Sequence, residues 1–210
     1  MSQTKVAVGM LDATGTPGSG NFLRGDSTWN APAAGGLTFI NTTDISGAAT
    51  YVFTATDASS YDGYGFFLQN VVPVTDAQWL EGRTSTDGGS SYDSGASDYS
   101  WGNDFLGDYT SDADEAFISF HGDNTSASYS VGSATNESGC SGWIWLIGPH
   151  LTGYTMVSAE LATNTGEPKL LIFNTAASRL SNADVDAFQL FFGSGNIETG
   201  TITVYGLANA

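Results

Sequence analysis

The sequence has few cationic side chains. Lysine and arginine together number 5 against 22 acidic residues in 210, which gives a formal net charge of -17. Nucleic acids and anionic membranes are bound through Lys and Arg, because these charges neutralise phosphates. We therefore expect no nucleic acid and no membrane surface among the partners of this chain.

Cysteine and long apolar runs are also scarce. Cys140 is the single cysteine, which excludes an internal disulfide and any multi-cysteine metal site. The first fifteen residues lack the apolar run of a signal peptide, and no stretch reaches the ~18 apolar residues that a membrane span needs. These features predict a chain that is made in the cytoplasm and is not inserted into a membrane.

What is abundant indicates strands and turns. Hydrophobic residues make up 40% of the chain, charged residues only 13%, and glycine alone contributes 27 residues. Long helices favour Ala, Leu, Glu, Lys and Arg, whereas strands favour β-branched and aromatic residues. The composition therefore predicts a folded, all-β protein.

From residue 37 onward, short β-branched and aromatic runs recur between turn signals. This pattern is typical of an antiparallel β-sandwich, here of the jelly-roll kind, with about ten strands. The expected strands are 37–41, 49–55, 64–72, 78–84, 98–102, 116–121, 142–147, 154–162, 168–174, 185–192 and 199–206.

Residues 1–36 form a different segment, rich in Gly, Pro, Ser, Thr and Ala. So little apolar surface cannot offset the entropy lost on ordering. We expect an extended N-terminal arm that orders on a partner, while residues 37–210 form the sandwich domain. Phe22, Leu23 and Trp29 are the expected anchors of this arm, with Arg24 and Asp26 pairing across a turn or between chains.

Two expected strands are apolar on both faces. The runs 143–147 and 188–192 carry large apolar residues at consecutive positions, yet a strand in a two-layer sandwich faces only one core. Either a neighbouring subunit or a loop of the same chain covers the second face. We expect a homo-oligomer, a trimer, with Trp143, Trp145 and Phe191 in its interface.

The stretch 85–116 is dense in Gly, Ser, Asp and Tyr and predicts a long loop at one end of the sandwich. Trp and Tyr rings stack on sugar rings, and carboxylates accept hydrogen bonds from sugar hydroxyls. We expect a glycan site here, formed by Trp101, Tyr99, Tyr92, Tyr109 and Asp104.

The same stretch is rich in carboxylates. Asp108, Asp112 and Asp114 are weak candidates for Ca²⁺ ligands. Their spacing matches neither the twelve-residue helix-loop-helix calcium pattern nor a calcium-binding β-roll repeat, and we expect no cofactor. A pair of these carboxylates could also act as in a glycosidase, which depends on a separation in space that sequence does not supply. We expect no enzyme.

Two parts of the chain resemble known proteins. GTPGSGNFLRGDSTW (Gly15 to Trp29) resembles a linker that recurs in tail-fibre and other virion proteins of tailed bacteriophages. The segments Phe53 to Trp101 and Ala187 to Leu207 are similar to a small β-sandwich domain often found at the end of phage fibre, spike and decoration proteins.

The resemblance implies a structural protein of the phage particle, homo-oligomeric and most often trimeric. It would attach to other virion proteins through its N-terminal arm (Phe22, Leu23, Arg24, Asp26 and Trp29) and expose the sandwich. Because the linker begins at residue 15, we expect a short fibre, spike, head fibre, decoration protein or tail-tip protein rather than a long fibre.

Three functions follow from these observations. The first is adhesion to a host-surface glycan by a short fibre or spike. The second is capsid or tail decoration that stabilises the particle. The third is a carbohydrate-binding module or polysaccharide hydrolase.

Overall fold

The computed structural model describes residues 14–16, 21–23, 27–30, 36–54, 61–105, 108–122, 126–167 and 169–208. The chain divides into two compact units, Met1–Gly36 and Leu37–Ala210.

The first unit contains a small hairpin. Strand β1 (Phe22–Leu23) pairs antiparallel with β2 (Trp29–Asn30), so that Leu23 lies opposite Trp29. The amide of Trp29 donates to the carbonyl of Thr14 at 2.8 Å. Arg24 and Asp26 lie outside the described residues. The part of this unit that is described thus has strand pairing of its own.

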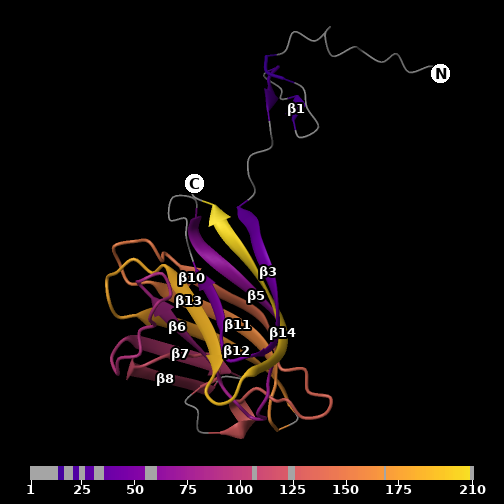
Figure 1. Ribbon diagram of the computed structural model, residues 1–210, viewed down its shortest axis with the longest axis vertical. Coiled ribbons are helices and arrows are strands. Elements are labelled where there is room, and N and C mark those ends of the chain that lie inside the picture. The colour runs from indigo at the N-terminus through magenta and orange to yellow at the C-terminus, as the bar shows by residue number, and fades with distance from the viewer. Residues whose placement is uncertain are drawn as a thin grey trace, which may run out of the picture. The chain divides into compact units, whose positions relative to one another are not determined.

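The second unit is built on an antiparallel sheet of eight strands (Figure 1). In spatial order these are β3 (Leu37–Ala48), β14 (Ile197–Ala208), β5 (Tyr61–Pro73), β10 (Cys140–Ile147), β11 (Met156–Asn164), β12 (Leu170–Arg179), β7 (Tyr99–Phe105) and β8 (Asp108–Glu115).

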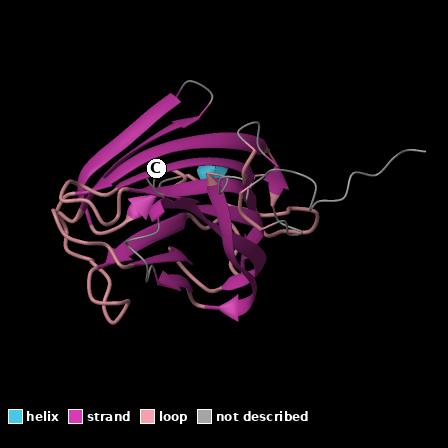
Figure 2. Ribbon diagram, turned by 90° about the horizontal axis from the view of Figure 1, so that it is seen from above, coloured by secondary structure: helices cyan, strands magenta, loops and turns pink. Residues whose placement is uncertain are grey.

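A smaller antiparallel sheet packs on one face of the large one (Figures 1 and 2). Its strands, in order, are β4 (Tyr51–Thr54), β13 (Ala187–Phe192), β6 (Leu80–Ser85) and β9 (Ile118–Ser119). A short 3-10 helix, η2 (Ala127–Tyr129), lies in the connection between β9 and β10. The expected all-β antiparallel sandwich is confirmed.

The core lies between the two sheets. Phe66 of the large sheet contacts Phe188 of the small sheet with ring centroids 5.3 Å apart, and Phe53 contacts Tyr64 at 5.0 Å. Along β11 the buried residues Val157, Ala159 and Leu161 alternate with exposed neighbours. Each large apolar side chain removed from water stabilises the fold by about 1.5–3 kcal/mol.

The expected loop 85–116 is wrong in its second half. Residues 99–105 and 108–115 form β7 and β8, a hairpin that ends the large sheet. Strand β8 (DYTSDADE) is an edge strand, so it needs no continuous apolar pattern, and its carboxylates discourage pairing with another chain. The first half, residues 86–98, does connect two strands as expected.

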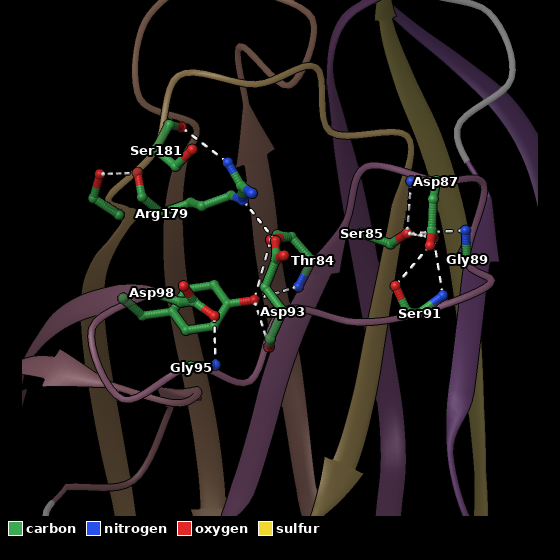
Figure 3. A network of polar contacts seen from close by, with 12 residues as sticks. Thr84, Ser85, Asp87, Gly89, Ser91, Asp93, Gly95, Asp98, Arg179 and Ser181 are labelled. Carbon is green, nitrogen blue, oxygen red and sulfur yellow. Dashed lines mark hydrogen bonds and ion pairs between the residues drawn. The ribbon is translucent and has the colours of Figure 1, made fainter.

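Polar contacts hold this connection in place (Figure 3). Arg179 donates from Nε to Asp93 at 2.7 Å, although only 7% of Arg179 is exposed. The hydroxyl of Tyr99 donates to the carbonyl of Asp93 and accepts from the amide of Thr84 at 2.8 Å. The connection is therefore tied to β12, β7 and β6 at one point.

A second group of hydrogen bonds lies a few residues earlier in the same connection. The Asp87 carboxylate accepts hydrogen bonds from the Ser91 hydroxyl, the Ser91 amide and the Ser85 hydroxyl (Figure 3). These bonds, that from the Ser91 hydroxyl above all, lower the pKa of Asp87 to about 2. Its oxygens are used within the chain.

His121 generates a prediction about stability and pH. The imidazole is fully buried, with Nε2 3.0 Å from Oγ1 of Thr163 and the ring 4.7 Å from that of Phe173. Burial lowers its pKa from the ordinary 6.5 to about 3. Below pH 6.5 the unfolded chain binds a proton that the folded chain does not, so stability falls as pH falls toward 3.

Between pH 7 and pH 5 this group alone should lower the free energy of unfolding by about 2 kcal/mol. Denaturant titrations of the wild type and of His121→Gln measure the difference, since the carboxylates are common to both. The variant should lose that much less stability over the same interval. Equal losses in the two proteins would contradict the assignment.

Candidate functional site

The outward face of the large sheet carries a hollow, because small side chains meet there in register. Ser158 of β11 pairs with Ala176 of β12, which pairs with Gly102 of β7, which pairs with Ser111 of β8. We call these four residues the floor row. Side chains of neighbouring strands stand side by side on one face, so four small ones in line leave space above the sheet.

Two adjoining hollows occupy this space. One has a volume of about 430 Å³ and the other about 630 Å³, and both are lined by Gly102 and Ala176. Volumes of this size are typical of ligand sites. Together they form the trough, which runs across the strands from β10 to β8, a distance of about 19 Å at the usual strand spacing.

Tryptophans form one end of the trough. Trp143 and Trp145 of β10 are both half-buried and stack with centroids 5.3 Å apart and planes 13° apart. Phe67 of β5 lies 4.9 Å from Trp143, and Tyr205 of β14 lies 5.7 Å from it. These four rings form the aromatic shelf. Trp145 is in register with Ser158, so the shelf directly adjoins the floor row.

Gly65 gives the shelf its shape. Trp145 pairs with Gly65 of β5, and a Cβ atom there would lie only 2.7–3.1 Å from three atoms of the Trp145 ring. A side chain at this position would push the indole away. The glycine thus leaves the space in which the Trp145 ring lies over the neighbouring strand.

One long side of the trough is polar. Trp143 pairs with Glu160, Glu160 with Asn174, and Asn174 with Asp104, so that these last three residues stand in one line across β11, β12 and β7. We call them the polar wall. All three are exposed and line the smaller hollow. They offer two carboxylates and an amide toward whatever occupies the trough.

The opposite side is more apolar. Tyr154 and Met156, 54% and 52% exposed, line the larger hollow together with Ser178, Ser100 and Ala113. The same register line continues away from the trough as exposed Ile147, Leu207 and Leu37. We call Met156, Ile147, Leu207 and Leu37 the apolar row.

The described Lys and Arg side chains make their contacts away from the trough. Arg179 pairs with Asp93, and Lys169 pairs with Glu167 at 2.9 Å. Arg83 donates to the carbonyl of Ala116 and lies 4.8 Å from the centroid of the Phe191 ring. Among the described residues that line the trough, the charged ones are Asp104, Asp112 and Glu160.

The structure corrects the expected glycan residues. Tyr99 is fully buried and Trp101 is 4% exposed, at the floor of the larger hollow, so neither ring is available for stacking. The alternation of β7 turns residues 99, 101, 103 and 105 toward the core. Tyr92 is half-buried, and burial raises the pKa of its hydroxyl. The side chain of Tyr109 lies outside the described residues, while Asp104 does line the trough.

The residues expected in an oligomer interface separate into two places. Trp143 and Trp145 lie on the outward face of the large sheet, at the trough. Phe191 lies on β13 of the small sheet, where Arg83 of the same chain covers it. The second apolar face of β13 thus has a partner within the chain.

The trough residues Glu160, Ser158, Asn174 and Ala176 were not among the expected site residues. Their strands alternate clearly in the sequence, as in MVSAELATN, which marks one face as exposed. The sequence contains no signal that aligns Ser158 with Ala176 and Gly102, because pairing register comes from the assembled sheet.

Neither a cluster of metal ligands nor a membrane-spanning helix occurs among the described residues. Among the described residues, no three His, Cys, Asp or Glu side chains gather as metal ligands, and Asp112 and Asp114 join no such group. The side chain of Asp108 lies outside them. The described part of the chain contains no helix that is long and apolar enough to cross a membrane.

Comparison of the chain with family models, with curated proteins and with solved structures finds no match in any of the three.

The contact between Gly65 and Trp145 makes a prediction. Replacing a strand glycine by alanine is ordinarily stabilising, but Gly65→Ala should cost about 1 kcal/mol, because the new methyl overlaps the indole. In a Trp145→Ala background the same change should be neutral or stabilising, because the ring is gone. Denaturant unfolding of the four proteins measures this reversal of sign.

Gly153→Ala serves as the control, since nothing lies within 4 Å of a Cβ at that position. It should have the same effect with and without Trp145. If Gly65→Ala had equal effects in both backgrounds, the proposed role of Gly65 in placing the ring would be wrong.

Proposed function

We propose that the chain is a glycan-binding adhesion module of a bacteriophage particle, a short fibre or spike that exposes its sandwich to the host surface. The observation that carries the proposal is the trough, with stacked tryptophans at one end and a polar wall along its side. The resemblance of Gly15 to Trp29 to a phage virion linker supports the phage setting.

The chemistry of the trough suits a sugar chain. The faces of Trp143 and Trp145 can stack on the C–H faces of pyranoses, while Glu160, Asn174 and Asp104 can accept hydrogen bonds from hydroxyls. A length of about 19 Å fits a short oligosaccharide better than a single sugar. The small side chains of the floor row leave room for sugar rings to lie flat on the sheet.

In this proposal the module binds its glycan and does not cleave it. Glu160 and Asp104 stand two strands apart in register, about 9.6 Å at the usual spacing. That lies at the wide limit for two catalytic carboxylates that act on a glycosidic bond through a water molecule. A polysaccharide hydrolase is therefore the alternative outcome, recognised by release of reducing ends from a bound glycan.

Binding should depend on the two tryptophans. Trp143→Ala and Trp145→Ala should each weaken binding to the recognised glycan at least about tenfold, because each removes stacking surface. Screening on an array of bacterial surface glycans identifies the ligand, and isothermal titration with the purified glycan measures the loss.

The control is Phe191→Ala, which removes a half-buried ring from the outside of the other sheet. It should leave the affinity unchanged. Wild-type affinity in correctly folded tryptophan variants would place the ligand elsewhere, and a protein that binds no glycan would overturn the proposal.

The second candidate function is decoration of the capsid or tail, which the apolar row favours. Leu37, Ile147, Met156 and Leu207 are each at least 40% exposed and stand in one register line across the sheet. An apolar line of this kind is typical of a protein contact. In the adhesion function we propose instead that copies of the chain associate through this row as a homotrimer. In both functions we propose that the first unit, with Leu23 and Trp29, attaches to other virion proteins.

The trimer has its own test. Light scattering should give three times the 21.8 kDa of one chain. Ile147→Asp with Leu207→Asp should dissociate it, because burying the new charges is costly. Val52→Asp is the control, at a 47% exposed position on the small sheet. A monodisperse 21.8 kDa wild type would refute association.

A further inference from the structure

We propose that the trough selects its glycan by charge and takes a chain of sugars that carry free amines. This inference rests on the proposed function, since it names the class of ligand for the same site. Two independent features of the trough favour an ammonium group, and a third, the charge of the whole chain, disfavours an anionic ligand.

The first feature is the set of carboxylates. Asp104 and Glu160 flank the smaller hollow and Asp112 lines the larger one, all three exposed. Hydrogen bonds between an ammonium and a carboxylate are stronger than those between neutral groups. No lysine or arginine is among the described residues that line the trough, so an ammonium on the ligand would meet no competing cation.

The second feature is the stacked pair of tryptophans. The face of an indole carries the negative part of the ring quadrupole and attracts cations, and Trp is the best aromatic residue for this. Trp143 lies directly opposite Glu160 in the strand register. An ammonium near this pair would therefore contact both an aromatic face and a carboxylate. A neutral hydroxyl carries no positive charge and would interact less strongly with both.

The third feature acts at a distance. The formal net charge of -17 gives a field that repels polyanions and attracts polycations before contact. The described cations do not offset it at the trough: Arg179 and Lys169 are paired with carboxylates, and Arg83 lies at Phe191 on the other sheet. Uronic, sulfated or phosphorylated sugars would meet unfavourable charge at both long and short range.

The test compares three glycan chains of equal length in one titration series: glucosamine oligomers with free amines, the same oligomers fully N-acetylated, and galacturonate oligomers. The amine chain should bind about tenfold more tightly than the N-acetylated chain, because it alone gains the ammonium contacts. The galacturonate chain should bind most weakly. Added salt should reduce the advantage of the amine chain, because exposed charges are screened.

Two kinds of variant then distinguish the contribution of charge to binding from that of ring stacking. Asp104→Asn with Glu160→Gln should abolish the preference for the amine chain, so that the amine and N-acetylated chains bind with equal affinity. Trp145→Ala should weaken both chains, because it removes stacking. The charge-matched control is Asp62→Asn with Glu198→Gln, two exposed carboxylates outside the lining of the trough, and it should retain the preference.

The outcomes distinguish this inference from the proposed function. Equal affinity for the three chains, or tighter binding of galacturonate, would overturn selection by charge while leaving a glycan-binding module. A preference that survives in the Asp104 and Glu160 variant, or that disappears equally in the control, would overturn the role of the polar wall. Failure of every glycan on the array to bind would overturn the proposed function itself.

Discussion

The candidate site depends on one constraint, the register in which β10, β11, β12, β7 and β8 pair. Side chains alternate between the two faces of a strand, so a shift of one residue exchanges the core and outer faces of that strand. If β12 slipped by one position, Ala177 or Thr175 would replace Ala176 in the floor row, and core residues would face water. The apolar core therefore fixes the register, and the register in turn fixes the trough.

The sequence predicted the fold class, and the alternation of side chains in its strands follows from the same constraint. In β14, Ile202 and Val204 are fully buried, as the alternation in TITVYG indicates. It missed β8, because an edge strand can be polar throughout. It could not predict the trough, whose floor residues Gly102, Ser158 and Ala176 are far apart in sequence and are unremarkable until pairing aligns them.

The expected glycan residues Tyr99 and Trp101 illustrate how local composition misleads. They stand in a stretch dominated by Gly, Ser and Asp, which suggests exposure, yet β7 turns both rings inward. The Tyr99 hydroxyl remains satisfied because Asp93 and Thr84 reach it, and Asp93 in turn neutralises buried Arg179. Removing one partner of such a pair would leave a charge with little solvent, which is costly. The polar groups of this connection thus serve the fold.

The acidic residues of the described chain fall into two groups. Asp93, Asp87 and Glu167 accept hydrogen bonds or ion pairs within the chain, and the described cations are occupied in structural contacts. Glu160 and Asp104 instead stand exposed in the polar wall of the trough, and Glu160 lies opposite Trp143 in the strand register. An exposed carboxylate costs the fold little, whereas in the proposed glycan site a carboxylate near Trp143 and Trp145 would select the ligand by its charge. In the proposed function, the excess of acid over base bears on recognition at the trough more than on the stability of the sandwich.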